Sequence, residues 1–248
     1  MGVDGRVAII TGSGQGIGEG IARHLGLRGA KVVLNDIDEE RVTKASEALR
    51  AEGVRATSVA SDVSVAGGAQ DLIDHAVSSF GTVDILVNNA GIARDKWLVK
   101  MSEDDWDIVM KVNLKSQFLC TKAAAVHMME KRYGRIVNIA SRAWLGGAGQ
   151  ANYSASKGGV VSLTRTLALE LAKYGITANA VAPALVDTPL FRSLKEDVQE
   201  RLIGTIPVGR IGGVEDIAQA VTFFASDESW YVTGQLLYVC GGRSVGAS

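Results

Sequence analysis

Tyr153 and Lys157 are the two side chains in this sequence best suited to move a proton. They stand four residues apart in a segment that has a helical pattern and continues as Gly-Gly-Val-Val-Ser-Leu-Thr. This spacing places both side chains on one helical face, one turn apart. A lysine ammonium near a phenol stabilises the phenolate and lowers the tyrosine pKa, so the pair could act as an acid and base near neutral pH. Taken alone, the pair is better explained as two surface side chains.

A glycine-rich loop near the start of the chain strengthens the catalytic interpretation. Residues 11–18 read Thr-Gly-Ser-Gly-Gln-Gly-Ile-Gly and lie between the first expected strand and the first expected helix. Glycines let a backbone turn tightly and approach a pyrophosphate, which then lies at the positive end of the helix. The loop therefore predicts dinucleotide binding, with a plain glycine-rich turn as the alternative.

Asp36 ends the second expected strand, 18 residues beyond Gly18. A carboxylate at this place accepts hydrogen bonds from both adenosine ribose hydroxyls and repels a 2′-phosphate. No arginine or lysine stands at Ser13 or Ile37 to hold such a phosphate. The sequence therefore favours NAD over NADP as the cofactor. Asp36 could instead cap the following helix, although Asp38 is better placed for that role.

The elements that must position these residues follow a regular alternation. Short β-branched runs alternate with longer amphipathic segments, which predicts an α/β fold with a parallel sheet and helices on both faces. The expected strands are 6–10, 31–36, 56–60, 85–88, 135–139, 177–181 and 235–239, and the expected helices are 17–28, 39–51, 68–80, 103–131, 153–173 and 214–225. We expect one domain over residues 1–248. Residues 184–207 have a mixed helical signal and are a candidate mobile lid.

Composition and charge exclude other classes of protein. With 47% apolar residues the chain can bury one large core, and a formal net charge of −1 leaves no basic surface for nucleic acid. Cys120 and Cys240 lie in apolar stretches without metal-ligand spacing, as expected for buried thiols in a reducing compartment. No apolar run approaches the roughly 18 residues of a membrane span, and the first residues lack a signal-peptide pattern. We expect a cytoplasmic protein with no metal, no nucleic-acid partner and no membrane segment.

The order of the motifs resembles that of the short-chain dehydrogenase/reductase family, in the form that has about this chain's length. The similarity extends over essentially the whole sequence. It is carried by the glycine loop, Asp62-Val63 after the third strand, Asn88-Asn89-Ala90-Gly91 after the fourth, Asn113, Ser141 after the fifth strand, Tyr153 and Lys157. The resemblance implies a single-domain Rossmann fold with a seven-stranded parallel sheet. It also implies a homotetramer, the common assembly of the family.

The same resemblance implies a role for each catalytic residue. Tyr153 would take the hydroxyl proton during alcohol oxidation and return it during carbonyl reduction. Lys157 would lower the Tyr153 pKa and bind the nicotinamide ribose. Ser141 would orient the substrate oxygen, and Asn113 would hold a water that extends the proton relay. Hydride transfer is the cofactor's chemistry, so the protein needs only positioning, a proton shuttle and a polar clamp on the oxygen.

The resemblance also implies the cofactor contacts, each of which has an ordinary structural alternative such as a turn or a helix-bound amide. The expected contacts are Gly12, Gln15, Gly16, Ile17, Gly18, Asp36, Asp62, Val63, Asn89, Ala90, Gly91, Tyr153, Lys157, Pro183, Val186 and Thr188. Two features depart from the family pattern. Ala184 follows Pro183 where glycine is usual, which disfavours a positive φ beside the nicotinamide. The spacing of 12 between Ser141 and Tyr153 is one residue shorter than in many relatives.

The substrate pocket is expected to have apolar walls. The predicted wall residues are Ala143, Trp144, Leu185 and Phe191. They favour a hydrophobic or cyclic secondary alcohol or its ketone. The overall similarity is greatest to the 3-oxoacyl-acyl-carrier-protein reductase branch, so a 3-oxoacyl-thioester reductase is the alternative, although Asp36 argues against the NADPH that this branch mostly uses. A non-enzymatic NAD-binding sensor or scaffold is a third class, and the presence of both Tyr153 and Lys157 argues against it.

Overall fold

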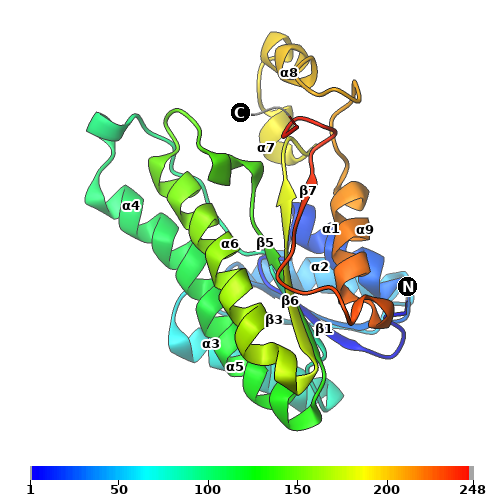
Figure 1. The fold of residues 1–248 in the computed structure, drawn as a ribbon. Helices are drawn as coiled ribbons and strands as arrows, with labels where there is room; N and C mark the ends of the chain where they lie inside the picture. Colours follow the sequence, from blue (N-terminus) through cyan, green and yellow to red (C-terminus); the bar gives the residue numbers. More distant parts are fainter. Residues whose placement is uncertain (1, 246–248) are drawn as a thin grey trace.

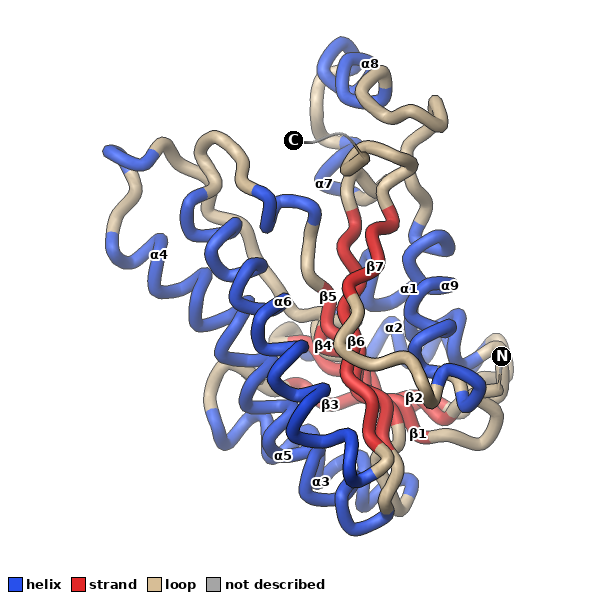
Figure 2. The backbone as a smooth tube through the Cα atoms, viewed as in Figure 1, coloured by secondary structure: helices blue, strands red, loops and turns tan. Residues whose placement is uncertain are grey.

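A seven-stranded sheet forms the centre of the protein, in a computed structural model that describes residues 2–245 (Figures 1 and 2). The strand order is β3-β2-β1-β4-β5-β6-β7, and every pair is parallel. The strands are β1 (Val7–Ile10), β2 (Lys31–Asp36), β3 (Ala56–Ala60), β4 (Ile85–Asn88), β5 (Gly134–Ile139), β6 (Ile176–Pro183) and β7 (Leu236–Val239). The order reverses between β1 and β4, and ligands of such sheets bind where this reversal opens a crevice.

Helices cover both faces of the sheet, as predicted (Figure 1). One face carries α1 (Gly16–Gly26), α2 (Glu39–Ala51) and α9 (Val214–Ala225), and the other carries α3 (Ala66–Phe80), α5 (Ser116–Lys131) and α6 (Ala151–Leu171). The helix α4 (Glu103–Met110) leads into α5, and the short helices α7 (Pro189–Arg192) and α8 (Glu196–Ile203) lie beyond the end of β6. The predicted fold class is confirmed.

The central strand β1 shows why its sequence is apolar throughout. Val7 and Ile9 pack into the cluster that contains α3 and α5, whereas Ala8 and Ile10 pack into the cluster that contains α1 and α9. Successive side chains of a strand point to opposite faces. A strand covered on both sides therefore needs an apolar residue at every position, and all four are buried.

The expected long helix 103–131 is interrupted by a π-helical turn at Lys111–Lys115. Within it the Ser116 N–H donates to the carbonyl of Lys111, five residues back, instead of four. The predicted helix was wrong in this detail, because apolar periodicity does not reveal one extra residue in a single turn. Asn113 lies fully buried in this turn, and such turns are frequent at functional sites.

The segment 184–207 lies at the carboxyl end of the sheet and contains α7 and α8 (Figure 1). Val186 forms an isolated parallel bridge with Gly212. Ala184 does not adopt a positive φ, because Arg132, with φ 54°, is the only non-glycine residue of the described chain that does. The Ala184 N–H donates to the carbonyl of Val239 at 3.3 Å. A lid function for this segment stays a prediction.

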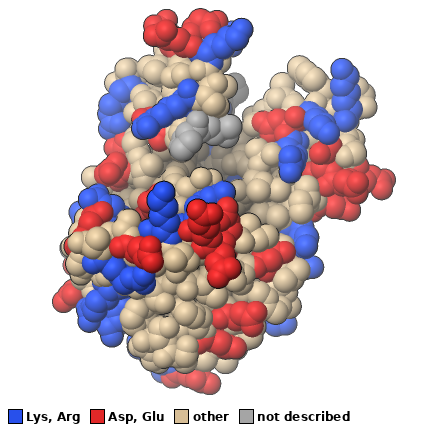
Figure 3. All heavy atoms as spheres, turned by 180° about the vertical axis from the view of Figure 1, so that it is seen from behind, with Lys and Arg blue, Asp and Glu red and all other residues tan. Residues whose placement is uncertain are grey.

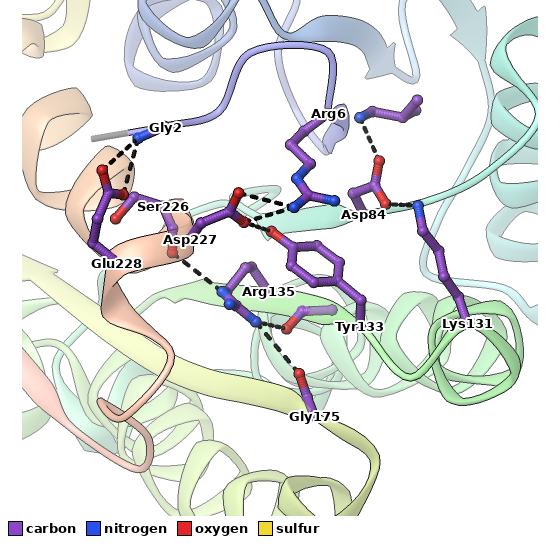
Figure 4. A network of polar contacts seen from close by, with 12 residues as sticks. Gly2, Arg6, Asp84, Lys131, Tyr133, Arg135, Gly175, Ser226, Asp227 and Glu228 are labelled. Carbon is purple, nitrogen blue, oxygen red and sulfur yellow. Dashed lines mark hydrogen bonds and ion pairs between the residues drawn. The ribbon is translucent and has the colours of Figure 1, made fainter.

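At the opposite end of the sheet, a polar network joins the first residues to the end of α9 (Figure 4). The ring of Tyr133 lies between two guanidinium groups, 3.9 Å from that of Arg6 and 4.5 Å from that of Arg135. Its hydroxyl donates to Asp227 at 2.6 Å, and Arg6 pairs with the same carboxylate at 2.8 Å. Burial and the hydrogen bond to Asp227 raise the pKa of Tyr133, so the phenol stays protonated as a donor.

A buried carboxylate completes this network on the β1 side. Asp84 accepts a hydrogen bond from the Val7 N–H at 2.9 Å and pairs with the ammonium of Lys131 (Figure 4). Its side chain is 3% exposed, whereas that of Lys131 is 38% exposed. Most of the cost of losing the contact would therefore fall on the Val7 N–H, which cannot reach water.

Asp84→Ala should lower the free energy of unfolding by about 1–3 kcal/mol, the usual cost of an unpaired buried donor. Urea denaturation of the variant and the parent measures the difference. Asp71→Ala is the matched control, because Asp71 is an exposed carboxylate on α3, and its effect should stay within about 0.5 kcal/mol. Equal losses in the two variants would contradict a special role for Asp84.

Candidate active site

A cleft of about 690 Å³ opens at the carboxyl end of the sheet. Every residue predicted to contact the cofactor lines it, together with Ser141. Seen from behind, the surface is hollowed between two lobes, and positive and negative side chains are interspersed around the hollow (Figure 3). The sheet thus brings together motifs that lie far apart in the sequence, at the place where its strand order reverses.

The glycine loop has the geometry that a phosphate group requires. Gly12 and Gly16 adopt φ values of 61° and 62°, which residues with a Cβ rarely adopt. A Cβ on Gly18 would stand 2.3 Å from the carbonyl oxygen of Gly12, whereas one on Gly16 would meet nothing within 4 Å. The loop is therefore tightly packed at Gly18, whereas Gly16, at the first turn of α1, has open space beside it. These residues fit a dinucleotide pyrophosphate.

Ser141, Tyr153 and Lys157 meet on the opposite wall of the cleft. The Ser141 side chain lies close enough to the Tyr153 phenol to act on its pKa. Lys157 is 2% exposed, its Nζ donates to the carbonyl of Ile139 at 2.8 Å, and it lies 5.7 Å from the centroid of the Tyr153 ring. A Cβ on Gly91 would come within 3.6 Å of this Nζ. The same Cβ would lie 3.3 Å from Asn113 Oδ1, so a larger residue at Gly91 would crowd Asn113 more than Lys157.

The protonation of this pair differs from the expectation based on spacing. Burial raises the pKa of Tyr153, the nearby Ser141 hydroxyl opposes the rise only in part, and the charge of Asp95 adds to it. Burial also lowers the pKa of Lys157 to about 8. The Lys157 ammonium donates to the Ile139 carbonyl and not to the phenol. Burial of the phenol is therefore the largest influence on the Tyr153 pKa. Tyr153 therefore carries its proton at neutral pH.

Asn113 lies behind the cleft and outside its lining residues. Its Oδ1 accepts from the Ile92 N–H at 2.8 Å, and its Nδ2 donates to the Ile92 carbonyl at 2.9 Å and to Ser156 Oγ at 3.2 Å. Both amide hydrogens are thus engaged within the protein. A water-holding role for Asn113 stays a prediction. Because its side chain is engaged, the water would have to bind the main chain of the π-helical turn.

The adenosine end of the cleft contains a residue that the sequence analysis missed. Asp36 accepts from the Gly14 N–H at 3.2 Å, and Asp38 caps α2 by accepting from the Arg41 N–H at 3.0 Å. The guanidinium of Arg41 also lines the cleft, 3.7 Å from Asp36. The sequence analysis considered a basic residue only at Ser13 and Ile37, and it therefore missed Arg41. The available signal was the helix cap, because the third residue after a cap folds back towards it.

The four predicted substrate-wall residues, Ala143, Trp144, Leu185 and Phe191, lie outside the residues that line the cleft. The indole N–H of Trp144 donates to the hydroxyl of Tyr238 at 2.7 Å, which turns the ring towards β7. Phe191 is 7% exposed and belongs to the buried core. Their role as pocket walls stays a prediction. Ile92 and Ala93, which follow Gly91, line the cleft on this side.

Residues 2–245 contain neither a candidate metal site nor a helix that could span a membrane. No group of three or more His, Cys, Asp or Glu side chains in this range could hold a metal ion. None of the helices in the same range is long and apolar enough to cross a bilayer.

Comparison with known proteins shows the class to which this fold and site belong. A family model described as enoyl-(acyl carrier protein) reductase matches residues 12–244. The chain belongs to the short-chain dehydrogenase/reductase family of oxidoreductases, and the predicted family is confirmed.

Individual relatives are similar over nearly their whole length. The chain is 49% identical to the (2S)-[(R)-hydroxy(phenyl)methyl]succinyl-CoA dehydrogenase subunit BbsD of Thauera aromatica, over 99% of both chains. It is 41% identical to the 3-oxoacyl-[acyl-carrier-protein] reductase FabG of Escherichia coli, over 98% of both. A solved structure of a proposed gluconate dehydrogenase from Agrobacterium tumefaciens superposes with a TM-score of 0.94 at 35% identity, covering 98% of this chain and 97% of that one.

Lys157→Met should raise the free energy of unfolding at pH 7 by about 1–3 kcal/mol. A pKa of about 8 in the folded chain, against about 10.4 in the unfolded chain, means that charging the buried amine costs stability. This cost is full below pH 8 and fades as the pH rises towards 10.4, while the lost bond to Ile139 reduces the gain. Urea denaturation of the variant and the parent at pH 7 and at pH 10 measures the difference in stability where the cost is full and where it has nearly disappeared.

The matched control is Lys44→Met, since Lys44 is exposed on α2. Its stability should be nearly the same as that of the parent at both pH values. A Lys157→Met variant that is less stable than the parent at pH 7 would contradict a costly buried charge.

Proposed function

We propose that the protein is an NAD(H)-dependent oxidoreductase that interconverts a secondary alcohol and its ketone. The observation that carries the proposal is the meeting of Ser141, Tyr153 and the buried Lys157 in the same cleft as the open glycine loop. This arrangement gives a proton shuttle within reach of a dinucleotide site. Such a combination supports hydride transfer better than hydrolysis or group transfer.

The nicotinamide, when bound, supplies the hydride acceptor for oxidation and the hydride donor for reduction. The chain's own groups handle the proton. One substrate oxygen can contact both hydroxyls, because Ser141 and Tyr153 lie close together in the lining of the cleft. In reduction Tyr153 gives its proton to the carbonyl oxygen while Ser141 holds that oxygen. In oxidation Tyr153 must first lose its proton, so its raised pKa favours oxidation at alkaline pH.

Lys157 and Asn113 act on this proton through position. The Lys157 ammonium, held by the Ile139 carbonyl at 2.8 Å, would bind a ribose hydroxyl and stabilise the phenolate when Tyr153 loses its proton. Asn113 fixes the backbone of Ile92 at the cleft wall. We infer that its main chain holds the water through which the proton reaches solvent.

The preference for NAD rests on Asp36. Its carboxylate is 8% exposed and lines the cleft at the end of β2. From there it can accept hydrogen bonds from ribose hydroxyls, and its charge disfavours a 2′-phosphate. The remaining cofactor contacts are those predicted from the sequence, all of which line the same cleft.

For the substrate, the relatives favour a molecule with an apolar part and a thioester. The name of BbsD describes a phenyl-bearing secondary alcohol on a coenzyme A thioester, and that of FabG describes a 3-oxoacyl chain on a carrier protein. A hydrophobic or cyclic alcohol therefore remains the proposed reacting part. The second candidate function, reduction of a 3-oxoacyl thioester, is favoured by these two relatives.

We further infer a homotetramer. Exposed apolar side chains gather on two separate faces, one at Ile108 and Phe118 on α4 and α5, and one at Trp230 and Tyr231 after α9. The first face borders a groove of about 980 Å³. Two self-complementary faces build a four-copy assembly. Sedimentation velocity on the full chain should give the mass of four copies, and a monomer would contradict the inference.

The proposed function is tested by NADH formation against acyclic, cyclic and aromatic secondary alcohols and a 3-hydroxyacyl-coenzyme A thioester, each repeated with NADP. Turnover of an aromatic or cyclic alcohol with NAD is the expected result. Activity confined to the thioester would support the second candidate. Absence of turnover with every substrate, together with thermal stabilisation by NAD, would instead indicate a non-enzymatic binding protein.

Tyr153→Phe should reduce turnover by at least about 10³-fold while NAD affinity stays within about twofold, because the ring remains and only the proton donor is lost. Stopped-flow rates and calorimetric NAD binding measure the two effects. Tyr174→Phe is the matched control, since Tyr174 lies beyond the far end of α6. Retained turnover in Tyr153→Phe would remove Tyr153 from the mechanism.

A further inference from the structure

Arg41 lies at the place where the ribose 2′ position of a bound adenosine is expected. It is the third residue of α2, and its side chain lines the cleft beside Asp36 and Ile37. Its NH2 group pairs with Asp38 at 3.0 Å, and its NH1 group lies 3.7 Å from Asp36 Oδ1. One cation is thus shared between two carboxylates at the cofactor end of the cleft.

The two contacts of Arg41 differ in strength. The 3.0 Å contact with Asp38 is within hydrogen-bond distance, and Asp38 is itself fixed as the cap of α2. The 3.7 Å separation from Asp36 is too long for a hydrogen bond. The side of the guanidinium that faces Asp36 therefore keeps unused N–H donors. A guanidinium binds phosphate oxygens through such donors in pairs.

Two neighbours place the Arg41 side chain at this corner of the cleft. Asp38 holds it from the helix cap, and the glycine loop closes the space behind it. A Cβ on Gly14 would stand 2.8 Å from Asp36 Oδ2 and 3.0 Å from Arg41 Cδ. The Arg41 stem therefore passes close to the loop, and the contact with Asp38 holds the guanidinium of this 40% exposed side chain beside the ribose site.

We propose that Arg41 is a second determinant of cofactor choice, a 2′-phosphate ligand that Asp36 masks. With both carboxylates present, the corner carries a net negative charge and disfavours the phosphate. Without Asp36, the N–H groups of Arg41 that are not bonded to Asp38 face the ribose and can donate to a phosphate. Removing one carboxylate then not only relieves repulsion but also exposes a cation. The inference deepens the proposed NAD preference and rests on that function.

Binding of adenosine 2′,5′-bisphosphate and of 5′-AMP, measured by isothermal titration calorimetry, tests the proposal without turnover. Asp36→Ala should raise the affinity for the bisphosphate by at least about tenfold, the scale of a new charge-assisted hydrogen bond together with the relief of a repulsion. The double variant Asp36→Ala/Arg41→Gln should lose most of this increase in affinity. Arg41→Gln alone should weaken the bisphosphate further and leave 5′-AMP within about twofold.

Arg50→Gln on the Asp36→Ala background is the matched control. It removes the same charge from the same helix about 13 Å further along its axis, beyond the screening length at physiological salt, and should leave the increase in affinity intact. An increase that persists in the Arg41 double variant would overturn the proposal and assign the whole effect to repulsion. If the parent chain binds neither nucleotide, the proposed cofactor site fails as well, so the two failures are distinguishable.

Discussion

The cleft depends on a clamp between the carboxyl ends of β1 and β4. Thr11 Oγ1 accepts hydrogen bonds from the N–H groups of Asn89 and Ala90 at 2.9 and 3.0 Å. In return the Asn89 amide donates to the carbonyls of Thr11 and Gly12, both at 2.9 Å. These bonds join two strands at the reversal of strand order, where no further ladder continues. They hold the glycine loop against the segment that follows β4. They therefore set the distance between the cofactor loop and the residues that line the cleft after β4.

A second layer of polar contacts carries this order to the proton-transfer groups. Asn88 and Asn138 are register partners on β4 and β5, and their amides are joined by a hydrogen bond of 2.8 Å. The Asn138 amide then donates to Thr164 on α6 at 2.9 Å. Buried polar contacts of this kind favour a single arrangement, because a slip would break both amide hydrogen bonds. The helix that bears Tyr153 and Lys157 is thereby held in register with the sheet.

Two kinds of feature could be predicted from the sequence: elements with a periodic pattern, and motifs whose residue types are tied to one kind of chemistry. The alternation of strands and helices, the glycine loop and Asp36 follow from local physics, and the loop and carboxylate lie together as expected. The π-helical turn does not follow, since it depends on which carbonyl the Ser116 N–H selects. Nor does the orientation of Trp144, whose partner Tyr238 is 94 residues away. The protonation of Tyr153 was likewise out of reach, because spacing along a helix carries no information about burial.

The network around Tyr133 also determines the order in which the chain can be completed. Arg6 and its partner Asp227 are 221 residues apart, although Arg6 directly precedes the central strand. Ribosomes add about 5–20 residues per second, so this contact must wait roughly ten seconds to a minute after Arg6 emerges. The neighbours of β1 in the sheet, β2 and β4, are made early. The residue just before β1 nevertheless lacks its partner on the nascent chain until Asp227 has been made.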